Sequence, residues 1–88
     1  MYHIRHEKRV VTDDLPSLPK SAHELIKKAI HARLAVAPHD YGKPLRRSLA
    51  GHRRLRVSDY RIIYRIDEPA KIVYIVAIGH RKDIYDDA

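Results

Sequence analysis

Cationic side chains are concentrated in the middle of the chain, and they are the residues most able to do chemistry. Residues 41–66 contain a single acid, Asp59, and their net charge of +7 equals that of the whole 88-residue chain. Their cations are Lys43, Arg46, Arg47, Arg53, Arg54, Arg56, Arg61 and Arg65. Forked guanidinium groups suit bidentate contact with phosphate, so the segment points to a polyphosphate or an acidic protein surface. The alternative interpretation is a solvated basic face that keeps the protein in solution.

Thiol and metal chemistry have little support in the sequence. The chain has no Cys, which excludes a disulfide-stapled scaffold and any Cys-ligated zinc or iron–sulfur site. The closest pair of histidines is His3 and His6, and on a strand this spacing places the two rings on opposite faces. We therefore predict no metal site and no cofactor.

The length and composition are typical of a small globular protein. The chain is long enough for a single domain, residues 1–88, and its 44% apolar fraction argues against disorder. Its longest apolar run, residues 72–78, falls far short of the ~20 residues that cross a bilayer. The basic residues 1–9 lack the apolar core of a signal peptide. We expect a soluble, cytoplasmic protein.

Two helices are predicted in the N-terminal half, after a short strand over residues 2–6. The first covers residues 7–15 and ends at Pro16. The second has apolar residues at helical spacing from Ala22 to Leu34 and closes before Pro38. It begins either with a capping box formed by residues 21–24 or with Pro19 in its first turn.

The C-terminal half reads as a sheet. Strands are predicted over residues 55–57, 60–66 and 71–78, separated by turns at residues 58–59 and 67–70. Gly79 is expected to end the last strand, which is apolar enough to be central, and a polar tail follows. The element order β-α-α-β-β-β predicts an α+β fold, in which a helical hairpin packs on one face of a mostly antiparallel, twisted sheet.

The period-two alternation of the strands places the cations on one face. Residues 60, 62, 64 and 66 are apolar or aromatic and share a face, as do residues 55 and 57. If these pack against the helices, the opposite face presents Arg54, Arg56, Arg61 and Arg65 together. Four clustered cations cost stability unless a polyanion offsets their repulsion, which favours a functional patch.

Four motifs now identify a family resemblance. They are Gly42-Lys43-Pro44-Leu45, Leu49-Ala50-Gly51, the run from Leu55 to Asp67 (LRVSDYRIIYRID) and the segment from Gly79 to Tyr85 (GHRKDIY). Together they resemble the RelE/ParE superfamily, the toxins of bacterial type II toxin–antitoxin systems. The resemblance covers nearly the whole chain and implies the small RelE-like fold.

The superfamily has two activities. RelE-type members cleave mRNA in the ribosomal A site, whereas ParE-type members poison DNA gyrase and lack the nuclease residues. The RelE pattern implies that Arg61, Arg81 and Tyr85 surround the scissile phosphate, with Tyr85 near the attacking 2′-OH. Two lysines of that pattern correspond here to His52 and Arg54, and Ile84 stands where some relatives have a histidine.

Cleavage by a 2′-OH needs a base, cations for the phosphorane and protonation of the leaving oxygen. Arg54 and Arg61 suit the electrostatic role, and Arg81 suits leaving-group stabilisation. Tyr85 needs neighbouring cations to lower its pKa from about 10, or else it holds a base by stacking. His52 suits proton transfer or phosphate contact. Further RNA or phosphate contacts are assigned to Arg56, Arg65, Lys43, Arg46, Arg47 and His80.

Structural interpretations stand beside several of these assignments. Arg65 could pair with Asp67 or Glu68, Tyr85 could cover the sheet edge, and His80 could be a hydrogen-bonded residue at the strand end.

The leading hypothesis is a ribosome-dependent mRNA endonuclease that inhibits translation. The alternatives are a gyrase inhibitor and an inactive toxin that binds its antitoxin alone. The implied partners are a cognate antitoxin, the ribosome and mRNA, with operator DNA bound through the antitoxin and no membrane.

Overall fold

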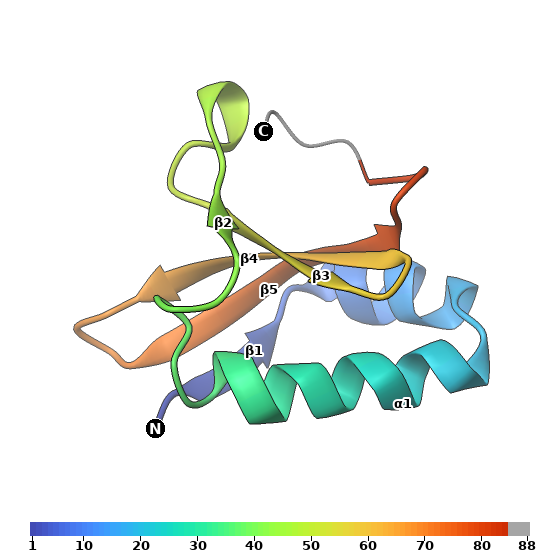
Figure 1. The fold of residues 1–88 in the computed structure, drawn as a ribbon, viewed down its shortest axis with the longest axis horizontal. Coiled ribbons are helices and arrows are strands. Elements are labelled where there is room, and N and C mark those ends of the chain that lie inside the picture. The colour runs from blue at the N-terminus through green and yellow to red at the C-terminus, as the bar shows by residue number, and fades with distance from the viewer. Residues whose placement is uncertain (85–88) are drawn as a thin grey trace.

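A computed structural model of the protein describes residues 1–84 and shows a twisted sheet with a helical hairpin on one side (Figure 1). The described strands are β1 (His3–His6), β2 (Lys43–Pro44), β3 (Arg53–Val57), β4 (Tyr60–Asp67) and β5 (Ile72–His80). Their order in the sheet is β1-β5-β4-β3-β2, with β1 parallel to β5 and the other neighbours antiparallel. This confirms the predicted α+β architecture and adds β2, which is too short to show an alternation in sequence.

The helical hairpin covers the inner face of the sheet (Figure 1). Its first arm consists of a π-helical turn, Val10–Asp14, and a 3₁₀ turn, Leu15–Ser17. Its second arm is α1, Lys20–Ala29, continued by a π-helical turn over Ile30–Leu34. Among the described residues, no helix has the length and apolar character needed to cross a membrane.

The start of α1 differs from both predicted alternatives, because Pro19 precedes the first helical turn instead of lying in it and no side chain caps the helix. Pro19 is the N-cap, with extended backbone, and its carbonyl accepts hydrogen bonds from the N–H groups of Ala22 (3.0 Å) and His23 (3.2 Å). No side chain caps this end of the helix, so the capping box of Ser21 and Glu24 is wrong. Ser21 is the second residue of the helix, two positions after the N-cap, so its side chain cannot act as the cap.

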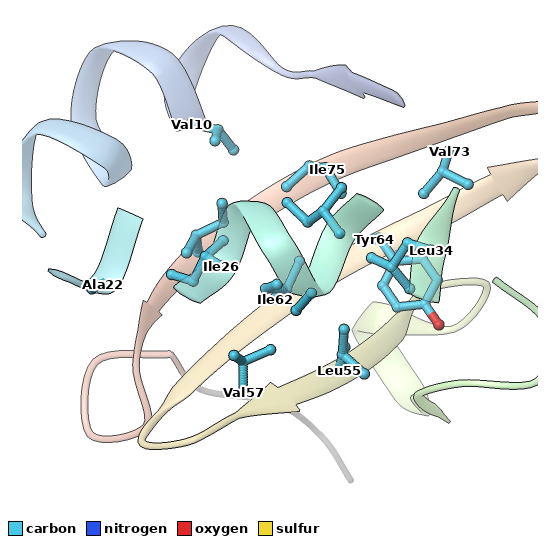
Figure 2. Close-up of a cluster of buried hydrophobic side chains, with 13 residues drawn as sticks. Val10, Ala22, Ile26, Leu34, Leu55, Val57, Ile62, Tyr64, Val73 and Ile75 are labelled. Atoms are coloured by element: carbon cyan, nitrogen blue, oxygen red, sulfur yellow. The ribbon is translucent and has the colours of Figure 1, made fainter. Parts of the chain in front are cut away.

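The main core lies between the hairpin and the inner face of the sheet (Figure 2). Tyr64 is its largest fully buried side chain, and its hydroxyl lies 2.9 Å from the carbonyl oxygen of Pro38 and 2.6 Å from that of Tyr41. Burial raises the pKa of Tyr64. Arg53, opposite Tyr64 in the sheet, donates to the carbonyl of His39 at 3.0 Å. These bonds fix the connection from the hairpin to the sheet.

A bulge in β5 changes which residues face the helices. Ile63 pairs with Ala77 and Tyr64 pairs with Ile75, so Val76 is an extra residue on β5. Ile75 and Ile78 consequently both lie in the inner core, although strict alternation would separate them. The strand also continues to His80, so the expectation that Gly79 ends it is wrong: Gly79 pairs with Arg61 inside the sheet.

Candidate nucleic-acid interface on the outer sheet face

The outer face, opposite the helices, carries a row of cations on neighbouring strands. Arg56 of β3 lies directly across from Arg61 of β4, and Arg54 lies across from Lys43 of β2. Side chains of such pairs start about 5 Å apart and point to the same face. We call Lys43, Arg54, Arg56 and Arg61 the arginine cluster. Like charges placed directly opposite one another destabilise a sheet, so the arrangement suits a bound anion.

A small apolar cluster forms the floor beside these cations. Its buried members are Leu45, Ile63, Ala77 and Ile84, with Leu49 and Val76 packed at its edge. Ile63 is opposite Arg54 in the sheet, and Ala77 follows on the next strand. This second core fastens the β2–β3 loop and the chain after β5 to the outer face, where both rise above the sheet (Figure 1).

The chain after β5 turns back onto the sheet and packs on Gly79. The carbonyl of His80 accepts hydrogen bonds from the N–H groups of Asp83 (2.8 Å) and Ile84 (3.1 Å). A Cβ on Gly79 would lie 2.8 Å from Cγ1 of Ile84, so this close approach needs glycine. Because Gly79 pairs with Arg61, Ile84 packs at the level of the Arg56–Arg61 pair. Tyr85, the predicted site tyrosine, lies outside the described residues.

His80 and Arg81 occupy the same end of the sheet in different ways. His80 faces the inner side with its cross-strand neighbour Tyr60, and their rings make an edge-to-face contact at 5.9 Å. Its Nδ1 accepts a hydrogen bond from the N–H of Lys82 at 3.1 Å. His80 is thus a hydrogen-bonded strand-end residue that the fold does not bring to the arginine cluster. Arg81 donates its N–H to the carbonyl of Asp59 at 2.8 Å and keeps its side chain exposed.

The β2–β3 loop carries three more predicted site residues. Arg46 and Arg47 are exposed, and Arg47 begins a 3₁₀ turn, Arg47–Leu49, with a left-handed φ of +56°. His52 closes the loop, because its carbonyl accepts from the N–H of Leu45 at 2.9 Å. Its Nδ1 is buried without a hydrogen-bond partner among residues 1–84. The residue as a whole is half-buried.

Arg65 shares the outer face but stands apart from the arginine cluster. Ile63 separates it from Arg61 along β4. Its guanidinium carbon lies 4.0 Å from the ring centroid of Tyr74, the residue opposite it on β5. Glu68, one of its predicted ion-pair partners, instead accepts hydrogen bonds from Tyr2 (2.6 Å) and Lys71 (2.6 Å).

Two contributors to the outer face were missed in the sequence. Tyr74 reads as part of a nearly continuous apolar strand, and the packing of Ile84 on Gly79 joins residues on either side of a turn. Alternation along β5 could have placed both Tyr74 and Gly79 outward, had the bulge at Val76 been known. No local signal in the sequence marks that extra residue.

The groups with shifted pKa values lie away from the arginine cluster. Hydrogen bonds from Lys71 and Tyr2 lower the pKa of Glu68 to about 2, and a contact of 2.7 Å with His39 adds to the effect. Burial, together with repulsion from His31, lowers the pKa of His6. Within the described part of the chain, no group of three or more His, Asp or Glu could hold a metal ion.

Fold and site together define a small α+β protein with a concentrated basic face on its sheet. The family model described as the ParE toxin of the type II toxin–antitoxin system, parDE, matches residues 3–85. The chain therefore belongs to this toxin family, within the RelE/ParE superfamily. It is a toxin of a type II toxin–antitoxin system.

Its relatives fall on the RelE-like side. Over 72 residues it is 40% identical to Toxin RelG of Mycobacterium tuberculosis, a match that spans 82% of this chain and 83% of that one. Toxin RelE of the same organism is 36% identical over 72 residues, a match that spans 82% of this chain and 74% of that one. The toxin–antitoxin complex RelBE2 from M. tuberculosis contains a chain with a TM-score of 0.84 and 35% identity, covering 91% of this chain and 98% of that one.

Proposed function

We propose that this toxin is a ribosome-dependent endoribonuclease that cleaves mRNA in the A site and so inhibits translation. The observation that supports this best is the Arg56–Arg61 pair, flanked by Arg54, on the outer face. Arginine remains protonated at physiological pH, so the three guanidinium groups form a permanent positive site. A phosphate that gains negative charge in the transition state is the anion that such a site stabilises most.

The reaction we propose is an intramolecular phosphoryl transfer. The 2′-oxygen bonds to phosphorus, the bond from phosphorus to the 5′-oxygen breaks, and a cyclic phosphate and a 5′-hydroxyl result. One proton leaves the 2′-OH and one reaches the departing 5′-oxygen. Arg54 and Arg61 stabilise the phosphorane, Arg81 the leaving oxygen, and Tyr85 acts at the 2′-OH.

His52 is the proposed proton carrier beside the arginines. Its side chain is half-buried, and an imidazole can both donate and accept a proton. The exposed cations Lys43, Arg46 and Arg47, together with Arg56, are proposed to contact flanking phosphates. His80 fits this role poorly, because it lies on the inner face with Tyr60.

A cognate antitoxin is the proposed protein partner, acting in the cytoplasm. The similar chain of RelBE2 was solved in a toxin–antitoxin complex. We expect the antitoxin to cover part of the toxin surface and to link the complex to operator DNA.

The second candidate is inhibition of DNA gyrase, which the ParE description of the matching family model favours. A gyrase inhibitor is a binding module and has no need of paired arginines beside a proton carrier. A third possibility is an inactive toxin that binds its antitoxin alone.

One pair of measurements separates the three. Purified toxin is added to ribosomes programmed with a defined mRNA, and cleavage is mapped by primer extension. In parallel, the toxin is induced in cells, and translation and DNA replication are followed separately. We expect cleavage at the A-site codon and an early loss of translation. Intact mRNA at saturating toxin contradicts the proposal, early loss of replication favours gyrase, and continued growth favours the inactive toxin.

A further inference from the structure

Arg65 and Tyr74 form a stacked pair on the outer face. They are directly opposite one another on β4 and β5, and the guanidinium carbon lies 4.0 Å from the ring centroid. Both side chains are half-buried, so the pair is neither enclosed nor fully solvated. A second pair of the same kind, Arg33 near Tyr41, is looser at 5.9 Å and lies off the sheet.

The pair lies on the same sheet face as the arginine cluster, farther along β4. Arg65 follows Arg61 by four residues on the same face of β4, a separation of about 13 Å between their Cα atoms. The side chain between them on that face is Ile63, which is buried in the apolar floor. A strand of RNA held by its phosphate at Arg61 and extended along β4 would therefore bring a neighbouring nucleotide over Arg65.

A guanidinium plane that rests on an aromatic ring is suited to a base more than to a phosphate. Unpaired bases stack on aromatic rings and on arginine planes, and they do so with little dependence on sequence. The Tyr74 ring supports one face of the guanidinium and so restrains its plane before any ligand arrives. A phosphate contact uses the N–H edge of the guanidinium, whereas a base stacks on its plane, so support of the plane favours a base.

We propose that Arg65, supported by Tyr74, is a stacking subsite for one unpaired RNA base beside the nucleotide whose phosphate the arginine cluster holds. The inference rests on the proposed RNA-cleaving function and adds a nucleotide-binding position to it.

The probe is a short single-stranded RNA with 2′-O-methyl groups throughout, so that no 2′-OH can attack. One 2-aminopurine is moved along it position by position, and the loss of its fluorescence on binding to the free toxin reports stacking. We expect strong quenching at one position. Arg65→Ala should abolish that quenching and weaken binding about tenfold, in line with the loss of one stacked base.

Three further variants sharpen the test. Arg65→Lys keeps the charge but loses the plane, so it should behave like Arg65→Ala. Tyr74→Phe keeps the ring and should quench like the wild type. Arg33→Ala removes a matched arginine–tyrosine contact away from the sheet and should leave quenching unchanged. Thermal unfolding midpoints identify any variant that fails to fold.

Several results overturn the subsite. Wild-type quenching in Arg65→Lys would show a phosphate contact, and unchanged quenching in Arg65→Ala would show no RNA contact. Loss of antitoxin binding in Arg65→Ala with normal RNA binding would make the pair a protein interface. Ribosomal cleavage without any quenching refutes the subsite alone, whereas quenching without cleavage refutes the proposed nuclease and leaves the subsite standing.

Discussion

Ile84 packs directly on Gly79: a Cβ atom added at position 79 would lie only 2.8 Å from Cγ1 of Ile84. Since Gly79 pairs with Arg61, this contact attaches the chain after β5 to the level of the arginine cluster. Ile84 is only 8% exposed and belongs to the apolar floor, so the attachment is a packed one. The segment leading to Tyr85 is thus held by a contact that one methyl group would break.

Gly79→Ala should therefore impair the toxin without unfolding it. The added methyl group displaces Ile84, and we expect cleavage in the ribosome assay to fall roughly tenfold, about 1.4 kcal/mol of barrier. Ile84→Ala should have a similar effect. Because both changes act through one contact, the double variant should lose less than the two single losses combined. Additive losses would show that the two residues act separately.

Arg61→Ala should abolish toxicity and leave antitoxin binding largely intact. The prediction follows from the position of Arg61 between Arg56 on β3 and Gly79 on β5. Growth after induction and antitoxin capture by the purified variant are the two measurements. Arg33→Ala, which removes an exposed arginine off the sheet, is the control and should remain toxic. If toxicity and antitoxin capture disappear together, Arg61 has a folding or interface role.

Tyr64→Phe should destabilise the fold by about 1–3 kcal/mol, because it removes the hydrogen bond that the Tyr64 hydroxyl donates to the carbonyl groups beneath the hairpin–sheet connection. The hydroxyl lies within hydrogen-bond distance of Pro38 and Tyr41, and it fills the space that Gly42 leaves open. Urea unfolding of the purified variant measures the loss. Tyr60→Phe is the matched control: Tyr60 lies partly buried at the edge of the core and the substitution keeps its ring contact with His80, so stability should change little. Equal effects of the two substitutions would contradict the assignment.

Acid should weaken the contacts that join the N-terminus to the β4–β5 turn. The pKa of Glu68 is about 2 in the folded protein against an ordinary 4.5, so the carboxylate favours folding above pH 4.5. That contribution is lost as the pH falls from about 4.5 to about 2, where Glu68 takes up its proton. Glu68→Gln should flatten the fall in the urea midpoint over this window, with Glu24→Gln on the exposed side of α1 as the control. An unaltered pH profile in Glu68→Gln would rule out this linkage.

Local patterns in the sequence predicted the parts of the fold that depend on local spacing. Helical spacing located α1, and the two-residue turn at residues 58–59 set β3 against β4 in the observed register. Alternation along these two strands was sufficient to place Arg54, Arg56, Arg61 and Arg65 on one face. Those residues are close in sequence, so one turn determines their pairing.

The remaining features depend on contacts between distant segments. β1 lies parallel to β5, although about 70 residues separate them, and no turn encodes that pairing. The sequence leaves His80 either as an RNA or phosphate contact or as a hydrogen-bonded strand-end residue, and its register opposite Tyr60 turns it to the inner face. Gly79 resembles a strand terminator in sequence, whereas its small size serves the packing of Ile84.

The extra residue in β5, Val76, determines which side chains of the strand face outward on either side of it. On one side of Val76, Tyr74 supports Arg65, and on the other, Gly79 receives Ile84; both are outward because one residue is left uncounted between them. Deleting Val76 would remove the bulge and leave Tyr74, Ala77 and Gly79 in regular alternation, so the tyrosine stack and the glycine contact would both stay on the outer face. The strand could therefore be shortened by one residue here without turning either contact inward, whereas an inserted residue would have to be taken up by a larger bulge.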